Sequence, residues 1–328
     1  MQNKQNGGMS SRGSPESWVR TRRVLCRSCV DFTWRAVCAA KETTKRYLMG
    51  FRYPKFPVLA LFTALICLSL SSCGRNHAGK IILAGSTSVQ PFAELWADAY
   101  TAKHPGVKIT VQGGGSSSGI ESALTGTSDI GTSSRELKPE EEFGAGEKVK
   151  LQKVPVAFDG IAVIVNVKSP LTNISKEQLR ELFSGHTNRI DNRPLTVVTR
   201  EEGSGTRTSF QESVMRLPDS KTTERISNSA LVQDSNGAIR EIVAEDPNAI
   251  GYISLGLVDK RVKTLSIDNI PPTVATVKNE KYKIVRRFLF VLKNRNNPLS
   301  EDFIKFCLSP EGQNLIAKKG LIKINDTQ

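Results

Sequence analysis

The sequence predicts an α/β protein with largely parallel sheets, because runs that read as strands alternate with runs that read as helices. Strand-like runs such as Lys80–Ala84 and Leu195–Thr199 are each followed by a helical segment. Three loops rich in glycine and hydroxyl residues, 85–88, 113–119 and 203–206, stand where a predicted strand passes into a predicted helix. Ligands of such sheets bind beyond the carboxyl ends of the strands, so these loops mark the expected site.

The first half of the body begins with Lys80–Ala84, an apolar strand that leads into the first loop. Apolar residues at helical spacing over Phe92–Tyr100 predict an amphipathic helix. Val107–Val111 alternates as a strand and leads into the second loop, after which Ile120–Leu124 begins a helix. Asp129–Gly131 is predicted as a short strand.

In the second half, Ile161–Val165 is a continuous apolar run, typical of a strand covered on both faces. Ser175 and Gln178 form a capping box that starts a helix. Leu195–Thr199 is a strand that delivers Arg200 to the third loop. The remaining predicted elements are a helix through Phe210 and Val214, a helix at Ala238–Val243, strands at Ile250–Ile253 and Phe288–Leu292, and a last helix from Ser309 to Gly320.

The net charge of +14 does not indicate a nucleic-acid partner, because it is concentrated in a leader. Residues 1–55 hold 12 of the 46 Lys+Arg and 3 of the 32 Asp+Glu, a net charge of +9. Residues 74–328 hold the remaining 34 and 29, a net charge of +5, since residues 56–73 are uncharged. The basic residues of the body are scattered and form no nucleic-acid motif. With 328 residues the chain can bury a large core.

An export signal is predicted at 49–73. Phe56–Leu70 is apolar and uncharged, follows Arg52 and Lys55, and is too short for a comfortable membrane span. It ends in Leu70-Ser-Ser-Cys73, which resembles a bacterial lipobox, so we expect Cys73 to be lipidated. The alternative is an uncleaved anchor. Translation is expected to start at Met49, leaving residues 1–48 as an untranslated leader. The protein is then exported and anchored to the cell membrane, facing the periplasm or cell exterior.

No metal site or cofactor is predicted. Cys26 and Cys29 have the spacing of a metal or redox pair, but no second pair completes a zinc site. His77, His104 and His186 lie far apart in the sequence. The chain has no GxxxxGK[ST] phosphate-binding loop, so nucleotide hydrolysis is not expected.

The three loops together predict a receptor for an oxyanion. Free backbone N–H groups at helix starts, with short hydroxyl donors, can replace the water around a buried anion. Arg200 adds a planar guanidinium that can hold an oxyanion through two hydrogen bonds. A single loop of this kind would read as an ordinary helix cap.

At these residues the chain resembles the phosphate-binding proteins of bacterial high-affinity phosphate ABC transporters, the PstS family. The resemblance runs from about Lys80 to Leu321. It is carried by GSTSVQP from Gly85, QGGGSSSG from Gln112, DIGTSSRE from Asp129, REEGSGT from Arg200 and AIGY from Ala249.

The resemblance implies a two-lobed fold of the periplasmic-binding-protein type (type II), with the ligand cleft between the lobes. Lobe one is expected at 79–157 plus 267–328, and lobe two at 158–266. The family captures inorganic phosphate and delivers it to permease subunits with a cytoplasmic ATPase, and is not enzymatic. The ligand-binding residues implied here are Thr87, Ser88 and Ser116 from one lobe, and Arg200, Ser204, Gly205 and Thr206 from the other. A monomer is expected.

One position departs from the family pattern. Many members carry an aspartate where this chain has Ser134, and that aspartate accepts the proton of monohydrogen phosphate and repels sulfate. We expect Ser134 to lie in the site, and we hypothesise that Asp159 replaces the missing acceptor. Arg135 is a candidate for additional positive charge in the pocket.

Three alternatives remain open from the sequence. The protein could bind another oxyanion such as sulfate or molybdate, or could sense phosphate for a signalling partner. A serine hydrolase is a third reading, because Gly115-Ser-Ser117-Ser-Gly119 matches G-x-S-x-G, and Asp159 and His186 follow in hydrolase order.

Overall fold

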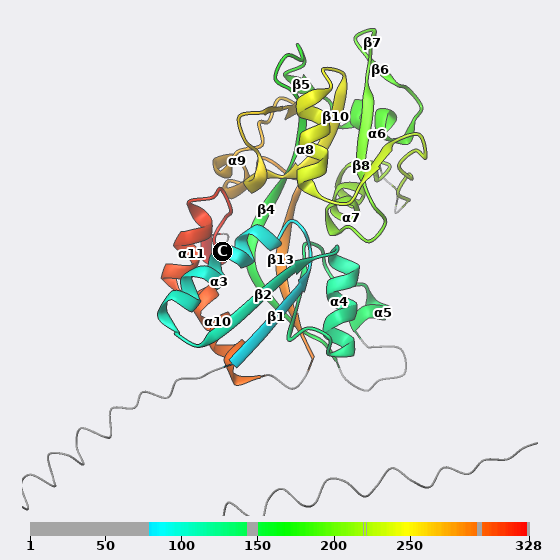
Figure 1. The fold of residues 1–328 in the computed structure, drawn as a ribbon. Coiled ribbons are helices and arrows are strands. Elements are labelled where there is room, and N and C mark those ends of the chain that lie inside the picture. Colours follow the sequence, from blue (N-terminus) through cyan, green and yellow to red (C-terminus); the bar gives the residue numbers. More distant parts are fainter. Residues whose placement is uncertain (1–78, 143–149, 219, 221, 294–296, 327–328) are drawn as a thin grey trace, which may run out of the picture. The chain divides into compact units, whose positions relative to one another are not determined.

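The computed structural model describes residues 79–328, apart from 143–149, 219, 221, 294–296 and 327–328 (Figure 1). The chain divides into two units, 1–73 and 74–328, and the fold below is that of the second. The predicted leader 1–48, the predicted signal peptide 49–73 and Cys73 lie outside the described residues. Within the described part, none of the helices is long and apolar enough to cross a membrane.

Every strand and helix predicted above overlaps an element of the structure. The strands are β1 (Gly79–Gly85), β2 (Val107–Gly113), β3 (Ile130–Ser133), β4 (Gln152–Asn166), β5 (Asn173–Ile174), β6 (Arg189–Ile190), β7 (Arg193–Pro194), β8 (Thr196–Arg200), β9 (Leu231–Gln233), β10 (Ala249–Ser254), β11 (Val262–Thr264), β12 (Ser266–Ile267) and β13 (Val285–Leu292). The α-helices are α3 (Gln90–Lys103), α4 (Ser116–Thr125), α5 (Pro139–Glu142), α6 (Lys176–Ser184), α7 (Gly205–Phe210), α8 (Asn236–Glu245), α9 (Val274–Lys278), α10 (Pro298–Leu308) and α11 (Pro310–Ala317). A π-helix, η2 (Gln211–Met215), and two 3₁₀ turns, η3 (Leu255–Leu257) and η4 (Ile324–Asp326), complete the fold.

The main sheet is mixed, which corrects the expectation of largely parallel sheets. Its strand order is β2-β1-β3-β13-β4-β10-β8-β9, with β11 also paired to β4. The pairs β1–β2, β1–β3, β10–β8 and β8–β9 are parallel. The two central strands, β13 and β4, are antiparallel to each other and to their other neighbours. The sheet is therefore parallel in its two outer parts and antiparallel in the middle.

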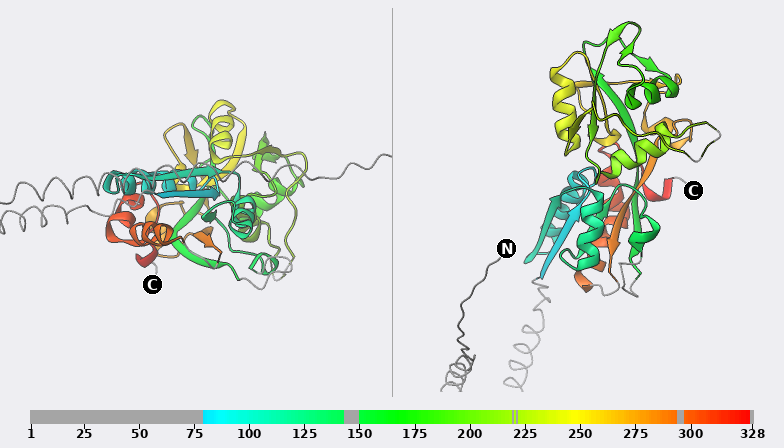
Figure 2. Two further views of the ribbon diagram at one scale, coloured as in Figure 1. Left: turned by 60° about the horizontal axis from the view of Figure 1, so that its bottom comes forward. Right: turned by 90° about the vertical axis from the view of Figure 1, so that its right-hand side faces the viewer.

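Strands β4 and β13 join the two lobes. Figures 1 and 2 show both strands running from one half of the fold into the other, side by side. Their register begins at Gly160 opposite Val285 and ends at Gln152 opposite Leu292. Since the two strands run in opposite directions between the same two lobes, they pair as an antiparallel ladder.

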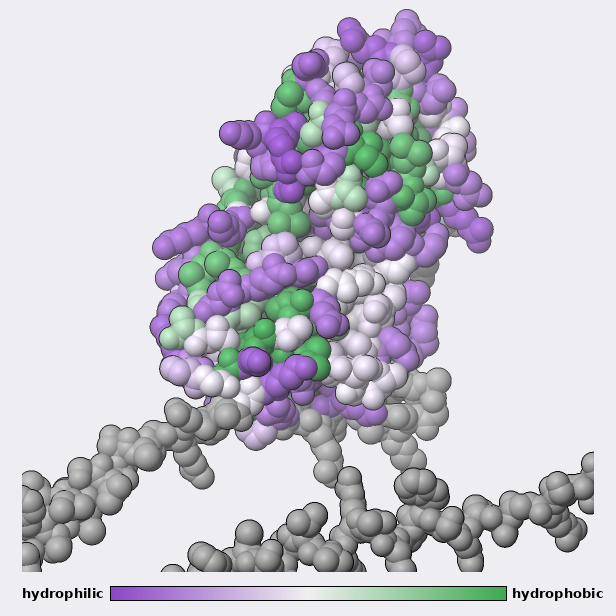
Figure 3. Space-filling model, in the orientation of Figure 1, coloured by the Kyte–Doolittle hydropathy of each residue, from purple (hydrophilic) through white to green (hydrophobic). Residues whose placement is uncertain are grey.

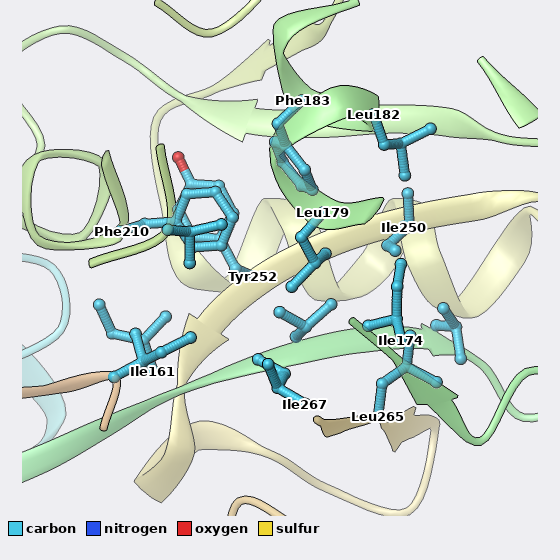
Figure 4. Packing of buried hydrophobic residues seen from close by; sticks show 14 of the residues in the cluster. Ile161, Ile174, Leu179, Leu182, Phe183, Phe210, Ile250, Tyr252, Leu265 and Ile267 are labelled. Carbon is cyan, nitrogen blue, oxygen red and sulfur yellow. The ribbon is translucent and has the colours of Figure 1, made fainter. Parts of the chain in front are cut away.

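Apolar side chains cover both faces of the sheet in each lobe. Along β4, Ile161 and Val163 face one cluster, while Ala162 and Ile164 face another on the opposite side of the strand. This alternation explains why the run from Ile161 to Val165 is apolar throughout. Figure 4 shows the first of these clusters packed against α6 and β10. In β13, Phe288 and Phe290 face one cluster and Leu289 and Val291 another.

The predicted lobe boundaries stay a prediction. Residues Leu265, Val277 and Ile284 pack in the same apolar cluster as Ile161 of β4, whereas Phe288 packs in the cluster of α3. β13 contributes to both clusters, through Val285 and Phe288.

The raised pKa values of the three tyrosines in the 74–328 unit predict that this unit loses stability at alkaline pH. Burial raises the pKa of Tyr100 and Tyr282, and raises the pKa of Tyr252 to about 12. In the unfolded chain tyrosine ionises near pH 10. Because the folded pKa is the higher one, this stabilisation is complete below about pH 10 and is lost as the pH rises through about 12. We expect tyrosinate absorbance to rise together with unfolding. Appearance of the full signal near pH 10 in folded protein would contradict this.

Candidate anion-binding site

Two of the predicted loops and the end of β3 form the first wall of the site, made of Thr87, Ser88, Ser116 and Ser134. A Cβ on Gly85, which has φ +136°, would overlap Thr132 O and lie 2.7 Å from Gly119 Cα. Glycine is therefore needed where β1, β3 and α4 converge.

On the face shown in Figure 3, residues of near-neutral hydropathy gather over α4, and hydrophobic residues form separate patches among hydrophilic ones.

The serines of the first wall are connected to one another. The backbone N–H of Ser134 donates to Ser116 Oγ at 3.0 Å, and Ser86 Oγ donates to Ser134 Oγ at 2.9 Å. Ser88, Ser116 and Ser134 are all buried. These hydrogen bonds between protein groups hold the short hydroxyl side chains in position without a ligand.

The second wall consists of Arg200, Ser204, Gly205 and Thr206. Arg200 is the last residue of β8, and the loop after it leads into α7. Ser204 caps α7, since its Oγ accepts from the backbone N–H of Arg207 at 3.3 Å. All four residues are buried.

The structure brings the two walls into contact. Ser88 Oγ and Thr206 Oγ1 lie 2.8 Å apart, and Arg200 Nη2 donates to Thr87 Oγ1 at 3.0 Å. A Cβ on Gly205 would overlap Ser116 Oγ and lie 2.7 Å from Ser134 Oγ. In addition, the backbone N–H of Ser117 donates to Gly203 O at 3.1 Å. Residues predicted from motifs far apart in the sequence thus form one cluster.

Arg200 carries a buried donor without a partner. Its Nε and Nη2 each donate to Glu201 at 2.9 Å, and Nη2 also donates to Asp234 O at 2.9 Å. The Arg200 side chain is 1% exposed, and its Nη1 has no hydrogen-bond partner among the described residues. Buried donors of this kind are rare in folded proteins. A buried, charged N–H on a residue that also contacts the Thr87 hydroxyl is suited to an oxyanion.

Arg135 does not point into the cluster. Its Nη1 and Nη2 donate to the two carboxylate oxygens of Glu141 at 2.7 Å, and Nη2 also donates to Ser117 Oγ at 2.9 Å. Burial of the Glu141 carboxyl opposes its ionisation, but hydrogen bonds from Arg135 and Lys138 outweigh this effect and lower its pKa. Arg135 therefore holds α5 against α4, and its charge is already balanced.

Two site residues were missed by the sequence reading, Arg286 in β13 and Asn236 in α8. Arg286 forms a buried ion pair with Asp159 at 2.8 Å, and it also contacts Ser88 and Thr206. Asn236 Nδ2 donates to Ser88 Oγ at 2.9 Å. The available signal for Arg286 was a charged residue inside an apolar strand, whereas Asn236 follows a helix cap and has no distinctive pattern.

The residues of the possible hydrolase triad are not assembled. Ser117 Oγ accepts from Arg135, and the Asp159 carboxylate accepts from Arg286 and from Ser254 Oγ. His186 is exposed at the surface after α6. Among the residues that the structure describes, no group of His, Cys, Asp and Glu is arranged to hold a metal ion.

Comparisons with known proteins agree with this architecture. The family model described as a PBP superfamily domain matches residues 72–311. A protein named phosphate-binding protein PstS from Bacillus subtilis (strain 168) is 28% identical over 295 residues, covering 82% of this chain and 94% of that protein. A protein of the same name from Borreliella burgdorferi is 28% identical over 280 residues, covering 81% of this chain and 98% of that protein.

Two solved structures are also similar. A putative phosphate ABC transporter substrate-binding protein with bound phosphate, from Clostridium perfringens, is 38% identical with a TM-score of 0.69, covering 75% of this chain and all of that chain. An ABC-type phosphate transport receptor from Vibrio cholerae is 34% identical with a TM-score of 0.60, covering 74% of this chain and 99% of that chain.

Proposed function

Since this chain belongs to the PBP superfamily, we propose that it is a phosphate-binding protein of the PstS type, which captures inorganic phosphate and delivers it to an ABC transporter. The relatives named phosphate-binding protein PstS and the two transport receptors support this assignment. They also support a role in binding rather than in catalysis. The family resemblance predicted from the loop motifs is thereby confirmed.

The single observation that carries the proposal is the buried Nη1 of Arg200, which has no partner in the described part of the chain. This donor lies on the residue that also contacts Thr87 of the opposite wall. A phosphate oxygen would satisfy it with a charge-assisted hydrogen bond. The same anion would come within reach of hydroxyl groups from both walls, so its binding would hold the two lobes together.

We assign phosphate binding to eight residues from the two walls: Thr87, Ser88, Ser116, Ser134, Arg200, Ser204, Gly205 and Thr206. In this assignment Ser204 serves as the helix cap that orients the Gly205–Thr206 backbone, consistent with its bond from Arg207. Ser134 contributes a hydroxyl group and no carboxylate, so the first wall adds no negative charge there. Arg135 is left out of the set because Glu141 already binds its guanidinium.

We further propose that the protein is an exported lipoprotein, anchored through Cys73 and working outside the cytoplasm with permease subunits and their ATPase. The support is the lipobox-like sequence ending at Cys73 and the role named for the relatives. Metabolic labelling with a fatty acid tests the anchor. Label should enter the wild-type chain and should be absent from Cys73→Ser.

A titration of the 74–328 segment tests the function. Phosphate should bind and should raise the melting temperature by mass action, with about 2.7 kcal/mol of added stability at 100 times the dissociation constant. Arsenate and sulfate are titrated in parallel. Both share the tetrahedral shape of phosphate, but arsenate keeps a proton near neutral pH as phosphate does, whereas sulfate is fully ionised. Tighter binding of sulfate than of phosphate would assign the protein to another oxyanion. Absence of binding for all three would overturn the proposal.

A further inference from the structure

A buried ion pair lies on the two strands that join the lobes. Asp159 of β4 stands directly opposite Arg286 of β13 in the strand register. Arg286 Nε and Nη2 donate to Asp159 Oδ2 at 3.0 and 2.8 Å, and the two side chains are 3% and 0% exposed. Burial raises the pKa of Asp159 and lowers the pKa of Arg286, while their contact opposes both shifts. Such a pair is costly to bury and requires satisfied hydrogen bonds.

Most acceptor positions of Asp159 are filled. Besides the two bonds that Oδ2 accepts from Arg286, Oδ1 accepts from Ser254 Oγ at 2.9 Å. A carboxylate offers about four acceptor positions. Three of them are therefore taken by groups of the protein, and the two bonds from Arg286 fix its guanidinium.

The other end of Arg286 reaches both walls of the anion site. Its Nη1 donates to Thr206 Oγ1 at 2.7 Å, and its Nη2 donates to Ser88 Oγ at 3.1 Å. Ser88 belongs to the first wall and Thr206 to the second. A single guanidinium on a crossing strand thus contacts a hydroxyl group from each lobe.

The hydrogen bonds around Ser88 determine which way its hydroxyl proton points. The backbone N–H of Ser254 donates to Asn236 Oδ1 at 3.1 Å, so the amide of Asn236 must present Nδ2 to Ser88. Ser88 Oγ then accepts from Asn236 and from Arg286, which fills its two acceptor positions. Its proton can only be donated, and Thr206 Oγ1 lies 2.8 Å away.

The two acceptor positions of Thr206 Oγ1 are also filled. Its Oγ1 accepts from Arg286 Nη1 and from Ser88 Oγ, so its own proton must also be donated. None of the hydrogen bonds among the described residues takes up that proton. The chain from Arg286 and Asn236 through Ser88 to Thr206 therefore ends in a directed donor.

We propose that Arg286, held in place by Asp159, is a second arginine of the anion site that acts through the hydroxyl groups of Ser88 and Thr206. By filling their acceptor positions, it directs the Ser88 proton to Thr206 and the Thr206 proton toward the anion, and it adds a positive charge behind them. Arg286 is a positioning residue in this scheme, and Asp159 positions Arg286 instead of accepting the proton of phosphate. The inference rests on the proposed phosphate function.

The experiment measures phosphate binding to the full chain and begins with the double variant Asp159→Asn/Arg286→Gln. This variant removes both charges together, which avoids leaving one of them buried and unpaired. We expect phosphate affinity to fall about 10- to 150-fold, the range for hydrogen bonds that involve a charged group. The matched control is Arg287→Gln on the same strand, whose exposed side chain pairs with Glu136, and its affinity should be unchanged. Equal affinities of the wild type and the double variant would overturn the inference.

A double-mutant cycle tests the route through Thr206, a readout that a merely structural role would not change. Thr206→Val should weaken binding clearly in the wild type and only slightly in the double variant, because the hydroxyl is no longer directed there. Ser116→Ala, which removes a hydroxyl that Arg286 does not contact, should cost the same in both backgrounds. Additive effects of Thr206→Val would overturn the proposed route.

A third measurement separates the two possible roles of Asp159. If Asp159 positions Arg286, then Asp159→Asn should weaken phosphate and sulfate binding together and leave their ratio unchanged. A ratio shifted toward sulfate would mean that Asp159 accepts the phosphate proton.

Melting temperatures without ligand verify that each variant is folded, and Arg286→Lys should bind better than the double variant. If the wild type itself binds no oxyanion, the proposed function fails first, independently of Arg286.

Discussion

Replacing Arg200 with alanine is expected to weaken phosphate binding by about 30- to 4,000-fold. The guanidinium is buried, contacts Thr87 of the opposite wall and offers the anion an N–H that no described residue accepts. Truncating one partner of a buried, hydrogen-bonded charge pair costs about 2–5 kcal/mol, and each 1.4 kcal/mol is about tenfold in affinity. Isothermal titration calorimetry with phosphate measures the change directly.

The matched control for Arg200 is Arg261→Ala. It removes the same charge from an exposed side chain that pairs with Glu241 and Asp259. Its phosphate affinity should stay within a factor of about two, because exposed pairs contribute little. Arg200→Lys should fall between the wild type and alanine, since lysine keeps the charge but cannot make a forked contact. An unchanged dissociation constant in Arg200→Ala would exclude Arg200 from the site.

A single added methyl group at Gly205 is expected to impair closure of the lobes. A Cβ there would overlap Ser116 Oγ and lie 2.7 Å from Ser134 Oγ, and both serines belong to the opposite wall. Overpacking of this kind costs about 1–3 kcal/mol, so Gly205→Ala should weaken phosphate binding by about 5- to 150-fold. Without phosphate the melting temperature should hardly change, because alanine is accepted at the start of α7.

Gly203→Ala is the control for this prediction. Its Cβ would lie 3.8 Å from Ser117 Cβ, an ordinary contact. Calorimetry should give near-wild-type affinity for this variant, and X-ray scattering should show the same phosphate-induced compaction as in the wild type. Full compaction of Gly205→Ala on addition of phosphate would mean that the two walls do not approach as closely as the structure indicates.

The sequence was informative wherever a local pattern determined the structure. The capping box at Ser175 and Gln178 forms as predicted, with both of its hydrogen bonds present. Ser309 caps α11 and Pro310 takes its first position. The hydroxyl-rich loops could be placed because each follows a strand and precedes a helix, which also put Ser88 and Thr206 into one predicted site.

The features of the fold and site that the sequence did not predict depend on pairing between strands that lie far apart in the sequence. Arg286 and Arg287 are adjacent in an apolar run, and the sequence does not reveal which of them faces inward. The choice is made by the register of β13 on β4, which sets Arg286 opposite Asp159, a partner 127 positions earlier. The antiparallel centre of the sheet escaped prediction for the same reason.

The backbone hydrogen bond from Ser117 N–H to Gly203 O has a consequence for the populations of open and closed protein. It joins the walls without any side chain, so no side-chain truncation abolishes it. Because this bond stabilises the closed arrangement, part of the protein is closed before phosphate binds. The apparent affinity scales with that closed fraction. Variants of the anion ligands should therefore retain some phosphate-independent closure, and single-molecule distance measurements between the lobes would detect it as a minor state.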